Sequence, residues 1–253
     1  MITMKVKSTT FNQQKSTSME RKISKQEVEI ENQITEIANK ISSADTEAIY
    51  DGVFDLELYK SSPIRLMYVL KEAYDEFDDQ NNAYGGGYSI PRDCFIKNDA
   101  GNVKTWQPII YTTYALFNDL KYNDMDYICN DKSMTDVLKQ IAYINTNKMP
   151  GQKTSDDSLI SKAYNTWKPV LMRQIDFYNP QVIIFCGTFK FYKADLVGVD
   201  TRPIHTSQSN SLSVYRKANG ALLLDAYHPN QRFVKHEIYV NDILNAIKEF
   251  LNK

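Results

Sequence analysis

Three residues able to do hydrolytic chemistry, and one glycine, stand where apolar runs of the chain end. The runs cover residues 64–70, 140–146, 181–187 and 221–227. At or just after their ends stand Glu72, Asn145, Gly187 and His228. Short apolar runs between turn signals are typical of strands buried on both faces of a parallel sheet. Ligands bind beyond the carboxyl ends of such strands. If the strands are parallel, a carboxylate, an amide and an imidazole therefore converge at one edge of the sheet.

Acidic residues are concentrated directly after the first run. They are Glu72, Asp75, Glu76, Asp78 and Asp79. A carboxylate in this place can orient a water molecule or stabilise a developing positive charge. Acids also favour the first turn of a helix, because its N-terminus carries a partial positive charge. Part of the cluster is therefore open to a purely structural interpretation.

A glycine-rich segment follows the acidic cluster, with the sequence YGGGY at residues 84–88. Three successive glycines give the backbone freedom to approach a ligand closely. The spacing matches neither the GxGxxG nor the GxxxxGK[ST] pattern of nucleotide-binding loops. We expect a mobile loop flanked by aromatic side chains, and no nucleotide cofactor.

The composition bounds the class of protein. The chain has 253 residues and a net charge of −1, so it lacks the overall basic character of many nucleic-acid-binding domains, although a local patch would suffice to hold phosphates. No run reaches the ~18 apolar residues of a membrane span. The N-terminus lacks the apolar core of a signal peptide, so we expect a cytoplasmic protein. The three cysteines are far apart and form no CxxC pair, so neither a metal nor an iron–sulfur cluster is predicted.

Alternating strand and helix signals predict an α/β fold. Helices are expected over residues 20–41, 103–127, 131–140, 156–178 and 237–251, and a loop over 202–216. We predict a three-layer α/β/α sandwich with a central four-stranded parallel sheet made by the four apolar runs. Residues 1–45 would form a polar arm plus an N-terminal helix that packs on its own domain, and residues 46–253 would form a catalytic domain.

Four segments, taken in order, resemble motifs of the uracil-DNA glycosylase superfamily. Residues 69–73, VLKEA, stand where that superfamily has a strand running into GEAPG or GQDPYH, and residues 143–151 resemble its TNVVKxRPPGN stretch. Residues 179–188 resemble the NPxxIxxLGxT strand, and residues 227–230 resemble the YHPS motif. The similarity spans about residues 64–250 and covers neither the N-terminal region nor the glycine-rich insertion well.

This resemblance implies a monofunctional DNA glycosylase of the same α/β fold, which hydrolyses the N-glycosidic bond of a flipped-out base and needs no cofactor. The implied catalytic residues are Glu72 and Asp75 near the sugar and His228 near the leaving base. Asn145 would read a base edge, because an amide offers both a donor and an acceptor. Without the resemblance, His228 and Asn145 could equally be residues that only hydrogen-bond the end of a strand or a turn.

The resemblance also implies where the substrate DNA would be held. The residues implied at the base are Ala73, Tyr74, Tyr88, Asn145 and Gly187, with Tyr84 as a further stacking candidate. DNA phosphates would be bound by Lys148, Arg232 and Lys235. His205 and His236 lie outside the motifs and are expected at the surface.

The chain departs from the family pattern at positions that bear on the substrate. Tyr74 and Asp75 replace the Pro-Gly after the catalytic acid, Asn230 replaces the serine of HPS, and the cysteines of the iron–sulfur branch are absent. These changes alter the wall beside the base. We therefore expect a modified or bulky pyrimidine, such as one found in phage DNA, with uracil as the alternative. A base of that kind would suit a role in antiviral defence.

Two other function classes remain open. One is a different α/β hydrolase, such as a nucleosidase or an esterase-like enzyme, although the chain has no GxSxG elbow. The other is a non-catalytic protein that keeps the fold to bind nucleic acid or a nucleotide. The sequence does not give the oligomeric state, and a monomer is the default.

Overall fold

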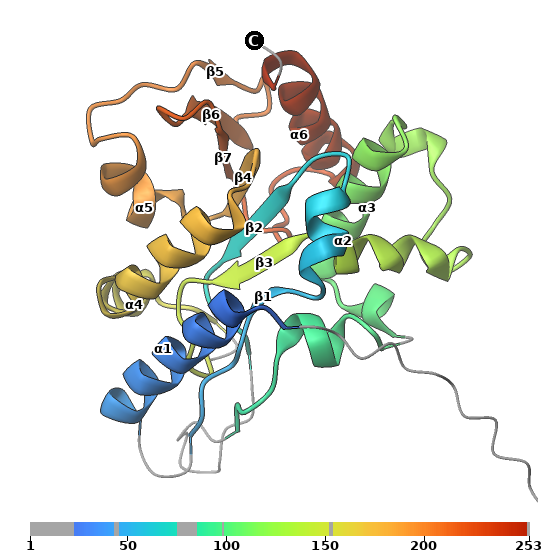
Figure 1. Cartoon of the computed structure of the whole chain (residues 1–253). Helices are drawn as coiled ribbons and strands as arrows, with labels where there is room; N and C mark the ends of the chain where they lie inside the picture. The colour runs from blue at the N-terminus through green and yellow to red at the C-terminus, as the bar shows by residue number, and fades with distance from the viewer. Residues whose placement is uncertain (1–22, 43–45, 75–84, 98, 152–153, 252–253) are drawn as a thin grey trace, which may run out of the picture.

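The computed structural model describes residues 23–42, 46–74, 85–97, 99–151 and 154–251. Its helices are α1 (Lys25–Ile41), α2 (Leu56–Ser61), α3 (Trp106–Phe117), α4 (Asp157–Tyr178), α5 (Phe189–Leu196) and α6 (His236–Phe250), as Figure 1 shows. Its strands are β1 (Gly52–Val53), β2 (Leu66–Leu70), β3 (Ala142–Asn145), β4 (Val182–Cys186), β5 (His205–Thr206), β6 (Leu212–Arg216) and β7 (Leu222–Ala226). Short helical turns are η1 (Ile90–Cys94), η2 (Ala100–Asn102), η3 (Tyr122–Asp124) and η4 (Lys132–Gln140).

The described strands form one mixed sheet of seven, in the order β1-β3-β2-β4-β7-β6-β5. The four strands predicted from the sequence, β3, β2, β4 and β7, are neighbours and run parallel. β1, β6 and β5 are added at the edges in antiparallel pairings. The prediction of a sheet with only four strands is therefore wrong, although the predicted strands make up the parallel middle of the sheet.

Two of the three missed strands, β5 and β6, lie in the stretch expected to be a loop, and the third, β1, has only two residues. β5 has only two residues, both exposed, and β6 follows a serine-rich segment, so neither shows a long apolar run. β6 returns into β7 through a tight turn in which Gly220 has a φ of 91°. An Asn-Gly pair between two apolar runs is a strong hairpin signal, and Asn219-Gly220 carries it here.

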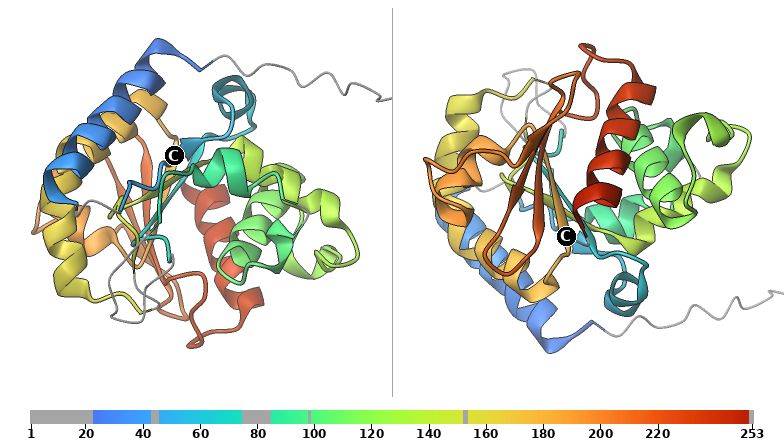
Figure 2. Two further views of the ribbon diagram at one scale, coloured as in Figure 1. Left: turned by 90° about the horizontal axis from the view of Figure 1, so that it is seen from below. Right: turned by 90° about the horizontal axis from the view of Figure 1, so that it is seen from above.

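The sheet lies between two helical layers, as the edge-on views of Figure 2 show, with α1 and α4 on one face and α3 and α6 on the other. Along β2, Leu66, Tyr68 and Leu70 join the core under α3 and α6. Met67 and Val69 join the core under α1, α4 and α5. This alternation is the period of two expected of a strand, and it explains why the run is apolar throughout. None of the helices in the described part of the chain has the length and apolarity needed to span a membrane.

Helix α1 packs on the rest of the chain, as predicted for the N-terminal helix. Ser24 and Glu27 form a reciprocal capping box at its start, which satisfies backbone N–H groups of the first turn. Ile30, Ile34 and Ala38, at helical spacing, are buried in the same core as α4. The predicted helix began at residue 20, but residues 20–22 lie outside the described residues.

The glycines of the YGGGY segment have a structural explanation. Residues 85–87 lie along residues 46–48, where Gly87 N–H donates to the Ala48 carbonyl oxygen at 2.9 Å. Gly86 has a φ of 83°, and a Cβ there would come within 2.0 Å of the Glu47 carbonyl oxygen. The close backbone contact requires glycine. The described part of this segment is thus paired to the chain, while Tyr84 lies outside the described residues.

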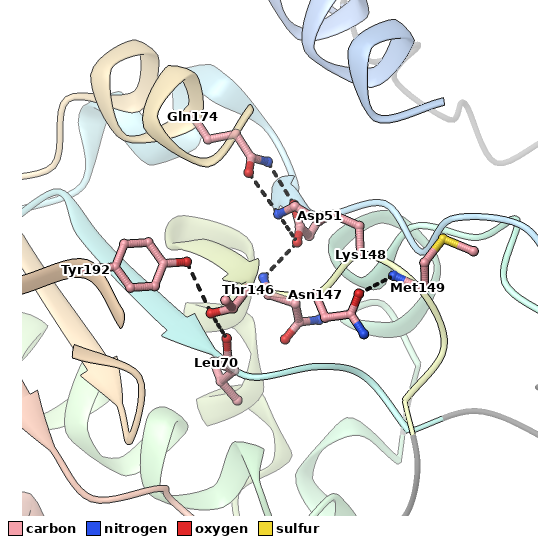
Figure 3. A network of polar contacts seen from close by, with 9 residues as sticks. Asp51, Leu70, Thr146, Asn147, Lys148, Met149, Gln174 and Tyr192 are labelled. Atoms are coloured by element: carbon pink, nitrogen blue, oxygen red, sulfur yellow. Dashed lines mark hydrogen bonds and ion pairs between the residues drawn. The ribbon is translucent and has the colours of Figure 1, made fainter. Parts of the chain in front are cut away.

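A buried ion pair ties β1, the end of β3 and α4 together (Figure 3). The Lys148 ammonium lies 2.7 Å from a carboxylate oxygen of Asp51, and neither side chain is exposed. Gln174 of α4 accepts from Lys148 and donates to Asp51, both at 2.8 Å. Burial lowers the pKa of Lys148, and the Asp51 charge opposes that shift. The prediction that Lys148 contacts a DNA phosphate is wrong, because its ammonium is enclosed and already paired.

Asp51→Asn removes the only carboxylate that the described structure pairs with this ammonium. Because the substitution leaves a buried charge uncompensated, we expect it to destabilise the fold by about 3–5 kcal/mol. Urea denaturation measures this. Lys139→Met, which breaks the solvent-exposed Lys139–Asp136 pair, is the control and should change the free energy of unfolding by less than about 1 kcal/mol. Equal effects of the two substitutions would contradict a structural role for the buried pair.

Candidate functional site

A cavity of about 610 Å³ opens beyond the carboxyl ends of β2 and β7. Five of the predicted site residues line it: Glu72, Ala73, Tyr74, Tyr88 and His228. The rest of its wall is made by Leu70, Lys71, Ile90, Cys94, Val103, Thr105, Trp106, Tyr143, Thr154, Ser155 and Asn230. β2 and β7 both flank β4, so the parallel sheet brings together a carboxylate and an imidazole that are 156 positions apart in the sequence.

Backbone pairing fixes the direction of the segment that carries Glu72. Beyond β2 and β3, Thr146 N–H donates to Leu70, Asn147 N–H donates to Lys71, and Gly151 N–H donates to Ala73, each at 2.8 Å. Beyond the carboxyl ends of β2 and β3, the two chain segments thus stay hydrogen-bonded to each other, although neither is a regular strand. These bonds hold residues 71–74 in place.

The Glu72 side chain is oriented by two residues of the segment after β3. Asn147 Nδ2 donates to Glu72 Oε2 at 3.1 Å. Gly151 packs so close that a Cβ there would lie 2.3 Å from Glu72 Cγ. One carboxylate oxygen is therefore occupied by an amide, and the side chain has little room to turn away. Asn147 and Gly151 both belong to the stretch that resembles TNVVKxRPPGN, but neither was among the predicted site residues.

His228 is held as a neutral imidazole with a defined tautomer. The Asn230 N–H donates to Nδ1 at 3.2 Å, so Nδ1 carries no proton and Nε2 carries it. Burial, and then the Lys71 charge, lower the pKa of His228 from 6.5 to about 4. The neutral ring therefore offers one N–H donor at physiological pH.

Asn145 is buried at the end of β3, and its side chain has no hydrogen-bond partner among the described residues. Its backbone N–H donates to Asp51 at 2.7 Å, which fixes its position. Strand alternation puts it on the same face of the sheet as Tyr143, which lines the cavity. An unpaired buried amide costs about 1–3 kcal/mol, so a polar partner is expected there. Asn145 is not itself part of the cavity wall.

Gly187 lies behind His228 rather than in the cavity wall. It has a φ of 73°, and its N–H donates to Ala226 at 2.7 Å. A Cβ on Gly187 would lie 3.7 Å from His228 N and 3.9 Å from Lys71 Cε. Gly187 thus lies beside Lys71 and His228 but is not among the residues that line the cavity, so its predicted contact with a base gains no support.

An aromatic wall faces the strand ends. Tyr88, Trp106 and Tyr143 line the cavity, and the rings of Trp106 and Tyr143 each meet Phe95 edge to face, at 5.1 and 5.5 Å. Burial raises the pKa of the Tyr143 hydroxyl, and the Trp106 indole opposes that shift. Trp106 and Cys94 were missed because they lie in residues 74–142, between the first and second motifs that carry the resemblance. Aromatic residues in that region were the one available signal.

The remaining predicted residues are exposed at the surface or lie outside the described residues. Arg232 and Lys235 are exposed and do not line the cavity. Between them Phe233 is 87% exposed, with its ring 5.9 Å from that of Tyr227. Tyr74 is 64% exposed at the cavity wall. Asp75, the second carboxylate predicted for catalysis, lies outside the described residues.

Metal binding finds no support in the described ranges, where no group of three or more His, Cys, Asp or Glu side chains is arranged to hold an ion. Comparison with known proteins adds no assignment. No protein-family model matches the chain, and a search of curated proteins finds no significant relative. The functional interpretation therefore depends on the geometry of the site.

Thiol labelling tests whether the cavity is open to solvent. Cys129 is exposed, Cys94 lines the cavity and Cys186 is fully buried, where burial also raises the pKa of its thiol. In native Cys129→Ser protein we expect an aromatic disulfide reagent to modify one further thiol, Cys94, slowly. Cys186 should react only after unfolding. A Cys94 thiol that stays unreactive until the protein unfolds would show that the cavity is closed.

Proposed function

We propose that this protein is a DNA glycosylase, a divergent relative of the uracil-DNA glycosylase superfamily, which hydrolyses the N-glycosidic bond of a flipped-out uracil or modified pyrimidine. The observation that carries the proposal is the shared cavity of Glu72 and neutral His228. A carboxylate and an N–H donor in one cavity match the two charges that develop when such a bond breaks. The sugar becomes positive, and the base becomes negative.

In the proposed reaction the C1′–N bond breaks and its electron pair goes to the base. The Glu72 carboxylate stabilises the positive sugar and orients the water whose oxygen adds to C1′, and it accepts the proton that this water loses. The His228 Nε2–H donates a hydrogen bond to the oxygen of the leaving base. Asn147 and the Asn230 N–H act through Glu72 and His228 and are positioning residues.

Base recognition is assigned to Asn145, whose unpaired amide supports this role. A pyrimidine presents a donor and an acceptor side by side, which an amide can match. Because Asn145 does not line the cavity, its buried side chain would have to turn toward the base once the base enters. Binding would satisfy the buried amide, so the protein would gain more from a base than from an apolar ligand of equal size.

Features around the opening suit a base drawn out of a DNA helix. The flipped base would stack on Tyr88 or Trp106, which line the cavity. Exposed Phe233 would act as an apolar wedge in the gap that the base leaves, as such side chains do in proteins that unstack DNA. Arg232 and Lys235, on either side of it in sequence, would hold phosphates.

The size of the cavity favours a substituted pyrimidine over plain uracil. Its volume of about 610 Å³ falls in the range of drug-sized ligands, and a single pyrimidine ring would leave much of it empty. We propose a base modified as in phage DNA as the preferred substrate, and a monomeric cytoplasmic enzyme with a defensive role. Uracil remains the alternative substrate.

Incubation with oligonucleotides carrying uracil, hydroxymethylated cytosine or glucosylated cytosine tests the reaction, with abasic sites and released base as readouts. Because both side chains stabilise developing charge, Glu72→Gln and His228→Ala should each slow release by about 10²–10⁴-fold. Glu57→Gln and His205→Ala alter exposed residues that do not line the cavity and should keep the wild-type rate.

Two outcomes would contradict the proposal. Release of base by none of the oligonucleotides would exclude glycosylase activity on them. Unchanged DNA affinity of Glu72→Gln together with an inactive wild-type protein would identify a binding protein instead.

The pH dependence of release follows from the neutral imidazole. Because the folded protein protonates His228 only near pH 4, the Nε2–H donor and the Asn230 hydrogen bond persist across the physiological range. We expect the single-turnover rate to show no step near pH 6.5 and to fall only toward about pH 4. A rate that halves near pH 6.5 and follows protonation of His228 in NMR spectra would be the contrary result.

A further inference from the structure

One cation of the cavity wall has no place in the reaction described so far. Lys71 lines the cavity next to Glu72, and its side chain is only 22% exposed. Backbone hydrogen bonds hold residues 71–73 against the segment after β3, and Lys71 and Glu72 both line the cavity. Lys71 turns toward Gly187 and His228, and its charge lowers the pKa of His228.

The Lys71 ammonium is fixed by an ion pair with the start of α4. Its Nζ lies 2.9 Å from Asp157 Oδ1, and Lys190 of α5 binds the other oxygen of the same carboxylate. Lys190 and then Lys71 lower the pKa of Asp157, so the carboxylate stays charged. One carboxylate shared by two ammonium groups leaves an excess of positive charge. Of these two lysines, only Lys71 lines the cavity.

We propose that Lys71 is a catalytic residue that stabilises the leaving base together with His228, with Asp157 holding its ammonium in place. This inference rests on the proposed glycosylase activity. As the C1′–N bond breaks, its electron pair moves onto the base, and a fixed cation at the His228 end of the cavity favours that movement. Lys71 transfers no proton. Glu72 serves the positive sugar, so the two charges of the transition state meet opposite charges of the protein.

The surrounding pairs provide a matched control. Lys71→Met and Lys190→Met each remove one of the two cations bound to Asp157, but only the first changes the cavity wall. Lys71→Arg keeps the charge. Circular dichroism and thermal unfolding of all three variants show whether they are folded.

The first measurement is an NMR titration of His228 in the free protein. Other charges near this region are Glu72 on the cavity wall and Asp225, which faces Lys190 and Lys193. Because a neighbouring cation disfavours the protonated imidazole, Lys71→Met should raise the pKa of His228 by about half to one unit. Lys190→Met and Lys71→Arg should leave it near the wild-type value. Equal shifts in Lys71→Met and Lys190→Met, or none, would overturn the proposal.

The second measurement is single-turnover release of uracil and of 5-fluorouracil from one oligonucleotide sequence, alongside the best substrate of the wild-type enzyme. We expect Lys71→Met to release base about 10–10²-fold more slowly, with Lys190→Met unchanged and Lys71→Arg largely active. The loss should be smaller for 5-fluorouracil, because fluorine already stabilises the departing anion. A wild-type rate in Lys71→Met would refute the role of Lys71, whereas an inactive wild-type protein would refute the glycosylase activity itself.

Discussion

The carboxylate of Asp51 is the interaction on which the position of the site depends. It receives hydrogen bonds from the Lys148 ammonium, the Gln174 amide and the Asn145 backbone N–H, all inside the protein. These bonds join the segment before β1, the end of β3, the chain that follows β3, and α4. A buried charge tolerates little displacement, because each lost partner leaves an unpaired ion or dipole. The segment after β3 therefore presents Asn145 and Asn147 at fixed places.

The segment after β3 in turn positions residues of the cavity wall. Backbone bonds pair the chain after β3 with residues 71–74, which include Lys71 and Glu72 of the cavity wall. Across β4, the turn after β7 holds His228 in one tautomer. The result is a cavity wall that carries a carboxylate, a cation and a neutral N–H donor. This set of groups is the physical basis of the proposed reaction, in which sugar and base acquire opposite charges.

Local patterns in the sequence were sufficient to predict the parallel middle of the sheet and the outline of the site. The four apolar runs became the parallel strands because a strand buried on both faces must be apolar at every position, which is visible along the chain. Their carboxyl ends then had to share one edge, so Glu72 and His228 could be placed together in advance. The edge strands escaped prediction because β5 and β6 are short, polar or exposed, and only Asn219-Gly220 marked their hairpin.

Only the tertiary structure decided which polar residues serve the cavity, because their partners are distant in sequence. Lys148 was predicted to bind a DNA phosphate, but its ammonium is paired inside the core with the Asp51 carboxylate, 97 positions away. Asn147 acquires its role from Glu72, 75 positions away, and Lys71 from Asp157. The glycines of the YGGGY segment are explained by the close contact of their backbone with residues 46–48 rather than by a ligand. The sequence determined which polar residues follow the ends of the strands, and long-range pairing of charges determined which of them remain available for chemistry in the cavity.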